Sequence, residues 1–414
     1  MFHKASTFLL LQSWIHEGSV MQIYIRFLLL SLLASGLYGL SLDEVISKAM
    51  NKSPSLESIQ HRISANRYEV DASGQFSNPE ISYVQNTLDK DQAMSRQTLT
   101  LKQNLPYFGK RERRHDVAQA EEEVLKENLE EAKVKLVNAI KNQAYTVWEL
   151  EELYKILHEY EELTRQNIEL FESYTSTSDN QHMGIMSAEL TLSDLRIQES
   201  ILKAEIYKAY ARLSYLAAFE IKDLDIELVM WDLPEASVLQ EGLVRNHAHA
   251  LKEKEVLRQK AMVEMADLNN YPDINVLAGY SYRENFDNYW TFGLGMSLPI
   301  YGTEDYEEQS ARKLALSVQS LSEDVKISVN SEFKTAYVQM RSAYEIYHIV
   351  EDEALPQIEH MFELTNSSIA TGGDLFKYID ILVKKLKLEK KRTTAVADYS
   401  RAEAKIAALS GEIE

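Results

Sequence analysis

The most constraining feature of this sequence is a proline-bounded segment that the chain carries twice. Pro79 and Pro106 enclose the first copy, and Pro272 and Pro299 enclose the second. The matching positions share one offset of 193 residues: Pro79 and Pro272, Pro106 and Pro299, and Gly109 and Gly302. Self-similarity at a fixed offset indicates a duplicated supersecondary unit. We therefore expect two repeats, each built from a helix, a β-hairpin and a long helical hairpin.

Each proline-bounded segment alternates apolar and polar residues, which predicts two β-strands. In the second copy the apolar set is Ile274, Val276, Ala278, Tyr280 and Tyr282, followed by Trp290, Phe292, Leu294, Met296 and Leu298. The first copy alternates more weakly, through Ile81, Tyr83, Leu99 and Leu101. Strands of about ten residues with aromatic ends are typical of transmembrane β-strands. An ordinary half-buried hairpin is the alternative reading.

Four strands are too few to close a barrel, because small barrels need about eight. An open sheet edge is not tolerated in lipid. If these strands enter a membrane, several chains must share one barrel. Three chains give twelve strands, an even number within the usual range.

Long helices are predicted after each hairpin, because glycine and proline are scarce at 14 and 7 residues. The tract 111–173 contains neither, and its apolar residues recur at spacings of four and three, as in a coiled coil. A helix of that length extends about 95 Å. A turn at 175–180 precedes a returning helix over 187–218. The second copy predicts helices over 305–366, with a kink at Pro356, and over 375–409.

The fold class predicted is mainly α with a small β part, internally duplicated, with long coiled-coil helical hairpins. We expect an N-terminal extension and signal peptide over 1–39. The first repeat spans 40–220, with a β-hairpin at 79–105 and a helical hairpin at 111–218. The second spans 221–414, with a β-hairpin at 272–299 and a helical hairpin at 303–410. The second repeat is expected to begin with an irregular stretch over 221–234, followed by one helix over 235–269. That helix matches the expected N-terminal helix of the first repeat, which spans 41–72 and is interrupted at Pro54.

Composition excludes several classes of function. The net charge of −20 argues against nucleic-acid binding, which needs a basic surface. The chain has no cysteine, so disulfides, thiolate metal sites and N-terminal lipidation are excluded. No catalytic constellation, phosphate-binding loop or dinucleotide motif is present, so we expect neither an enzyme nor a cofactor or metal site.

The N-terminus carries the pattern of a secretory signal peptide. From Met21, Arg26 precedes the apolar run 27–33, and small residues follow. That run is too short to span a bilayer as a helix. Met21 is the expected start, and the chain is expected to leave the cytoplasm.

Taken in order, several short motifs resemble those of the TolC-like outer-membrane efflux channel family, over nearly the whole mature chain. They are Ser41 to Val45, Asn51 to Leu56, Asn78-Pro79, Gln103 to Pro106, Pro272, Leu298-Pro299, Leu355-Pro356 to Gly373, and Ala408 to Glu412. The Gly109-Lys110-Arg111 ending is similar to that of the heavy-metal (cobalt-zinc-cadmium or copper) branch. Many relatives there are lipoproteins, whereas this chain lacks the cysteine that lipid attachment requires.

The resemblance implies a homotrimer with a twelve-stranded barrel in the outer membrane of a Gram-negative bacterium and a twelve-helix periplasmic tunnel. It also implies two partners, a periplasmic adaptor and an inner-membrane pump of the RND type. The implied function is efflux of heavy-metal cations or small toxic compounds. A type I protein-secretion conduit and a general multidrug duct are the alternatives, and a periplasmic adaptor or scaffold is a third possibility.

Acidic residues near the helical tips are the candidate gate. By resemblance, Asp380 stands where family members carry a constriction aspartate. Asp374 lies nearer the same tip, and Glu189 is the loose counterpart in the first repeat. A threefold ring of carboxylates favours cations; for Asp374 and Glu189 the alternative is stabilisation by the helix dipole. Gly184, Gly372 and Gly373 mark the tips expected to dock the adaptor.

Overall fold

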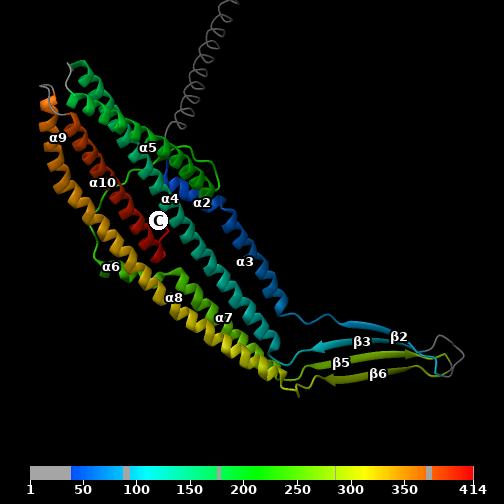
Figure 1. Ribbon diagram of the computed structural model, residues 1–414. Helices are drawn as coiled ribbons and strands as arrows, with labels where there is room; N and C mark the ends of the chain where they lie inside the picture. Colours follow the sequence, from blue (N-terminus) through cyan, green and yellow to red (C-terminus); the bar gives the residue numbers. More distant parts are fainter. Residues whose placement is uncertain (1–38, 87–93, 175–178, 285, 370–374, 414) are drawn as a thin grey trace, which may run out of the picture. The chain divides into compact units, whose positions relative to one another are not determined.

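The computed structural model describes residues 39–86, 94–174, 179–284, 286–369 and 375–413 (Figure 1). Residues 1–38 of the predicted signal peptide, residues 87–93 within the first β-hairpin and the two helical tips at 175–178 and 370–374 lie outside the described residues. Among the described helices, none has the length and apolar character needed to cross a bilayer.

The helices and strands follow the predicted order closely. The helices are α2 (Leu42–Lys52), α3 (Pro54–Ser73), α4 (Lys110–Tyr174), α5 (Asp179–Ala217), α6 (Ala236–Glu241), η1 (Gly242–Arg245), α7 (His247–Asn269), α8 (Thr303–His348), η2 (Ile349–Ala354), α9 (Leu355–Ile369) and α10 (Leu375–Leu409). The strands are β1 (Leu40–Ser41), β2 (Glu80–Gln85), β3 (Gln97–Leu105), β4 (Leu224–Asp225), β5 (Ile274–Tyr282) and β6 (Tyr289–Met296). The prediction of a mainly helical chain with two β-hairpins is confirmed.

Contacts divide the chain into two compact units, which we describe separately. The first contains residues 39–52, 140–230 and 346–397, and the second contains 53–139, 231–345 and 398–413. Each unit therefore takes segments from both predicted repeats. The duplication itself stays a prediction.

The first unit is helical apart from a short parallel pair, in which Leu40 lies opposite Leu224. This pair interrupts the stretch 221–234, which was expected to be irregular throughout. The core of the unit joins α4, α5 and α10, and its buried residues are Leu157, Tyr160, Ile168, Phe171, Ala188, Leu195, Leu375, Tyr378, Ile379, Leu382 and Leu386. A second cluster joins η2, α9 and α10 through Val350, Leu355, Ile358 and Ile381.

The second unit contains a four-stranded antiparallel sheet in the order β2-β3-β5-β6 (Figure 1). The two predicted hairpins lie side by side because β3 pairs with β5 along nine residue pairs, from Gln97 opposite Tyr282 to Leu105 opposite Ile274. In the helical part, α3 packs on α4, where the Asn66 amide donates to the Ala118 carbonyl. Helix α7 meets α4 through the Arg258–Glu121 ion pair at 2.6 Å.

The prediction of one helix over 235–269 is wrong. The segment breaks into α6, η1 and α7 at Asn246, whose backbone is extended and whose side chain accepts a hydrogen bond from the His249 N–H. Its amide also donates to the Leu409 carbonyl at the end of α10. An asparagine that caps a helix in this way satisfies a backbone donor that would otherwise be unpaired. The capping bond and this second contact account for the break.

The predicted kink at Pro356 takes the form of a π-helical turn, η2, directly before it. The Leu355 N–H bonds the carbonyl of Val350, five residues earlier. A proline ring clashes with the carbonyl four residues before it in a regular α-helix, and a wider turn relieves that clash. The helix therefore absorbs one extra residue and continues as α9.

Candidate functional site

One face of the four-stranded sheet is apolar across all four strands. The register aligns four rows that run across the sheet: Leu105, Ile274 and Met296; Gln103, Val276 and Leu294; Ile81, Leu101, Ala278 and Phe292; and Tyr83, Leu99, Tyr280 and Trp290. The Phe292 and Leu294 side chains are 77% and 82% exposed. A contiguous exposed apolar surface of this kind is typical of a membrane or protein interaction site. The apolar sets predicted separately from each strand thus form one continuous surface.

The opposite face of the sheet is polar and rich in small residues. One row across it consists of Ser82, Thr100, Gly279 and Thr291. Gly293 faces Leu277, and a Cβ on Gly293 would lie 2.9 Å from the Leu277 Cγ. Glycine at 293 is what gives Leu277 room on this face. One apolar and one polar face is the alternation expected of a strand between lipid and a water-filled interior.

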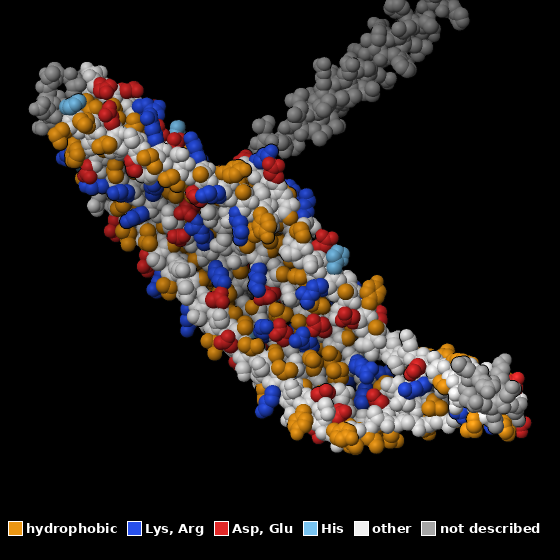
Figure 2. All heavy atoms as spheres, turned by 45° about the vertical axis from the view of Figure 1, so that its right-hand side comes forward, with side chains coloured by type: hydrophobic (Ala, Val, Ile, Leu, Met, Phe, Trp, Pro, Cys, Tyr) orange, Lys and Arg blue, Asp and Glu red, His pale blue; other side chains and the backbone are white. Residues whose placement is uncertain are grey.

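Both outer strands of the sheet have a free edge. Within the described residues, β2 pairs with β3 alone and β6 pairs with β5 alone. Unpaired backbone groups at an exposed edge are a template for another strand. Figure 2 shows hydrophobic side chains along the border of the strand region, whereas charged side chains are frequent over the helices.

The Gly109-Lys110-Arg111 motif has a structural role at the base of the sheet. Gly109 has a φ of +92°, which glycine tolerates at no steric cost. The Lys110 side chain is 6% exposed, and its Nζ lies 2.8 Å from Asp273 Oδ1 and donates to the Tyr271 carbonyl. The rings of Tyr107 and Tyr271 stack with centroids 4.6 Å apart. The motif thus joins the end of β3 to the start of β5.

Electrostatics hold Asp273 as a carboxylate. Burial alone would raise its pKa, but hydrogen bonds from Lys110 and from the Tyr107 backbone N–H hold the pKa below its ordinary value. We name the group formed by Lys110, Asp273, Tyr107 and Tyr271 the sheet-base latch. Sequence reasoning missed it, because Lys110 and Asp273 are 163 residues apart.

At the tip end, Asp380 lies on an exposed and strongly basic stripe of α10. Its Oδ2 accepts a hydrogen bond from Lys384 Nζ at 2.7 Å. Lys387 and Lys391 continue the exposed stripe at helical spacing, and neither has an ion pair among the described residues. An acid beside three lysines does not by itself make a cation-attracting ring. These lysines are already recognisable in the sequence, four, seven and eleven residues after Asp380.

The other candidate tip residues are less informative. Glu189 is exposed on α5. Gly184 lies in the same helix and is buried. A Cβ added to Gly184 would lie 3.4 Å from the Cβ of Leu375. Asp374, Gly372 and Gly373 lie outside the described residues. Of the three acids, the described residues therefore include only Glu189, on α5, and Asp380, on α10.

An apolar stripe follows the exposed side of α5. Met183, Met186, Leu190, Ile197 and Ile201 are all exposed, at spacings of three, four, seven and four. These spacings are those of a coiled-coil seam. Within one chain the seam has no complete partner among the described residues.

No protein-family model and no curated protein sequence matches this chain. Solved structures do match. The open-state MtrE outer membrane channel of Neisseria gonorrhoeae aligns with a TM-score of 0.77 at 14% identity, covering 90% of this chain and 89% of that one. The outer membrane protein VceC of Vibrio cholerae aligns at 0.76 and 15%, covering 90% and 97%. The CmeC outer membrane channel of Campylobacter jejuni aligns at 0.73 and 13%, covering 89% and 85%. This chain therefore has the fold of those outer-membrane channels over nine-tenths of its length.

Proposed function

We propose that this protein is the outer-membrane channel of a tripartite efflux system in a Gram-negative bacterium and acts as a homotrimer. The observation that carries the proposal is the sheet, which combines one continuous apolar face with two free edges. In water both features favour aggregation. In lipid the apolar face is solvated, but the edges must be closed by other strands.

Three copies of the sheet supply the missing partners. Strand β6 of one copy runs antiparallel to β2 of the next, so three four-stranded sheets close a barrel of about twelve strands without a break in the alternation. The exposed stripe of α5 supports the same assembly, because a coiled-coil seam packs against a neighbouring helix. The channel makes and breaks no covalent bond, and it needs no cofactor.

Pairing between β2 and β6 of different copies can be tested by cysteine cross-linking, because the native chain has no cysteine. Ser82→Cys in β2 is combined in turn with Thr291→Cys, Gly293→Cys and Gly295→Cys in β6, all on the polar face. At least one pair should give a covalent trimer upon oxidation. Each single-cysteine variant is the control and should give no cross-link, since β2 meets β6 and never itself. A dimer from Ser82→Cys alone, or a protein that stays monomeric in detergent, would contradict the proposal.

The partners follow from the same proposal. We infer that the helical tips dock a periplasmic adaptor, which connects the channel to an inner-membrane pump of the RND type. The similar solved structures are outer-membrane channels, and the sequence resemblance to the TolC-like family adds the adaptor and the pump. A type I protein-secretion conduit shares this fold and remains the alternative.

Cargo is the least constrained part of the proposal. Heavy-metal cations or small toxic compounds are the first choice, and a general multidrug duct is the alternative. Within the motif, Gly109 makes the turn, Lys110 belongs to the sheet-base latch and Arg111 lies over the Phe76 ring, all without reference to cargo, so the motif no longer favours metals. A deletion strain grown on graded zinc, cadmium, cobalt and copper, beside bile salts and dyes, decides the question. Sensitivity confined to metals supports metal efflux, and sensitivity confined to detergents and dyes supports the multidrug alternative.

A further inference from the structure

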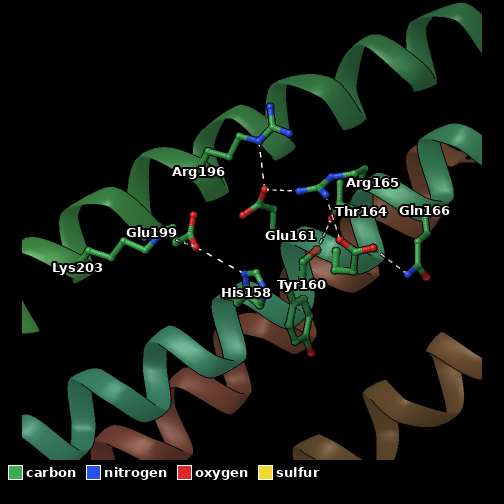
Figure 3. Close-up of polar contacts among 10 residues, drawn as sticks. His158, Tyr160, Glu161, Thr164, Arg165, Gln166, Arg196, Glu199 and Lys203 are labelled. Carbon is green, nitrogen blue, oxygen red and sulfur yellow. Dashed lines mark hydrogen bonds and ion pairs between the residues drawn. The ribbon is translucent and has the colours of Figure 1, made fainter. Parts of the chain in front are cut away.

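A cluster of potential metal ligands lies between α4 and α5, away from the sheet and the tip acids. His158 and Glu161 stand three residues apart on α4, and Glu199 faces them from α5 (Figure 3). One ligand atom from each residue lies within 4.8 Å of the other two. Glu161 and Glu199 keep only 7% and 15% of their side-chain surface, whereas His158 is 62% exposed. The cluster is thus partly buried, with one open side.

The hydrogen bonds of Glu161 leave one of its oxygens free. Arg165 and Arg196 both bind the same atom, Oε1, at 2.7 and 3.1 Å. Among the described residues no donor reaches Oε2, and Figure 3 shows this second oxygen on the side of Glu199 and His158. The two arginines thus leave the second oxygen of a nearly buried side chain open to a cation or to water.

Of the other two groups, Glu199 is paired with Lys203 at 3.2 Å, and His158 is only loosely held. His158 Nδ1 lies 3.6 Å from Glu199 Oε1, too far for a good hydrogen bond, so the imidazole is not committed to that partner. Its ring stacks on Tyr154 with centroids 6.1 Å apart, which limits its orientation. The Glu199 carboxylate faces the His158 ring from α5 and is partly buried, with 15% of its side-chain surface exposed.

We propose that His158, Glu161 and Glu199 bind a borderline divalent cation such as Zn²⁺, which ties α4 to α5. One imidazole and two carboxylates are ligands that zinc accepts, with a fourth position left for water. Two atoms that share one zinc lie at most about 4.4 Å apart, since each bond is about 2.0–2.2 Å. The cluster must therefore close slightly when the ion binds. The imidazole selects zinc, cobalt or nickel over the hard ions calcium and magnesium.

Three neighbouring cations set the limit on affinity. Arg165, Arg196 and Lys203 already compensate the nearby carboxylates, so a divalent ion adds positive charge to a balanced group. Each of these side chains is at least two-fifths exposed, and solvent screens its repulsion. The site is thus expected to bind zinc reversibly rather than to retain it through purification.

Zn²⁺ titration of the purified, detergent-solubilised full chain by calorimetry, made without a histidine tag, tests the site. Wild type should bind one Zn²⁺ per chain at this site. His158→Gln should weaken that binding by at least about tenfold. His158 is exposed, so this variant keeps the fold, which circular dichroism verifies. The matched control is His61→Gln, because His61 also lies 3.6 Å from a glutamate, Glu57, but belongs to no three-ligand cluster among the described residues.

A second readout separates a metal site from a chance contact. Zn²⁺ should raise the thermal unfolding midpoint of wild type and of His61→Gln equally, and it should raise that of His158→Gln clearly less at the same Zn²⁺ concentration. Glu199→Gln should behave like His158→Gln. The proposal is overturned if wild type binds no Zn²⁺, if His158→Gln binds it as tightly as wild type, or if calcium binds as tightly as zinc.

Discussion

At the scale of single residues, the contrast between Lys110 and Asp380 shows how burial changes the value of an ion pair. Lys110 has almost no contact with solvent, and its ammonium group depends on Asp273 and on a backbone carbonyl. Asp380 is half exposed, and its pair with Lys384 is open to water and salt. The first pair holds structure together, whereas the second adjusts local charge.

Lys110→Gln should therefore lower the free energy of unfolding by about 3 kcal/mol. This is the low end of the range for a broken buried ion pair, because a quarter of the Asp273 side chain is still exposed to solvent. Thermal unfolding measures the loss. Lys126→Gln, on the exposed side of α4, is the control and should cost under about 1 kcal/mol. Equal losses in the two variants would show that the sheet-base latch does not matter.

The same pair predicts a pH dependence. The folded-state pKa of Asp273 is lowered, so its contribution to stability is fully present above about pH 4 and is lost as the pH falls through the lowered pKa. In Lys110→Gln this acid-sensitive part of the stability should shrink, which unfolding curves between neutral and acidic pH would reveal.

Replacing Asp380 tests whether the α10 stripe lies in the conduction path. Asp380→Asn frees Lys384 and should shift the reversal potential of single channels towards anion selectivity, measured in planar bilayers at low salt, where charges are weakly screened. Lys384→Gln should shift it the opposite way, and the double variant should lie near wild type. Glu205→Gln, which disrupts a similar exposed pair on α5, is the control. Unchanged potentials in both single variants would remove Asp380 from the path.

At the scale of elements, the π-helical turn before Pro356 makes a prediction of its own. A π turn holds one extra residue, so its removal restores a regular helix without rotating the parts on either side. Deleting the exposed Glu353 together with Pro356→Ala should therefore leave Leu355 and Ile358 packed against Ile381. Deleting Glu323 from the regular part of α8 is the control. It rotates everything beyond it by about 100° and should abolish folding. Trimer yield after purification compares the two, and equal yields would mean that the turn is not an insertion.

The limits of sequence prediction also lie at this scale. Alternation placed Trp290, Phe292 and Leu294 on one face, because a strand's faces follow from its period of two. The pairing of β3 with β5 could not be predicted, since no turn connects them and register between separate hairpins depends on the whole sheet. Pro356 predicted an irregularity but not its type. Asn246 was missed as a break, because a capping residue inside a polar helical pattern resembles any other surface residue. The zinc cluster needs α5 to face α4, which periodicity alone does not show.

At the scale of the whole molecule, the fold agrees with those of known outer-membrane channels although identity is only 13% to 15% in the three structures compared. Within this chain, Gly109 and Gly302 bend the backbone at equivalent places after the two hairpins, both with positive φ. Agreement at this level of identity extends to the fold and says nothing of a transported compound.

The two free edges of the sheet also have a genetic consequence. Each barrel of the proposed trimer needs three intact subunits. If a cell makes equal amounts of a normal subunit and a subunit with a defective strand edge, only about one-eighth of randomly assembled trimers contain three normal subunits. A defect in β2 or β6 that still permits pairing on one side should thus behave as dominant over the normal allele. A defect that prevents folding altogether should behave as recessive.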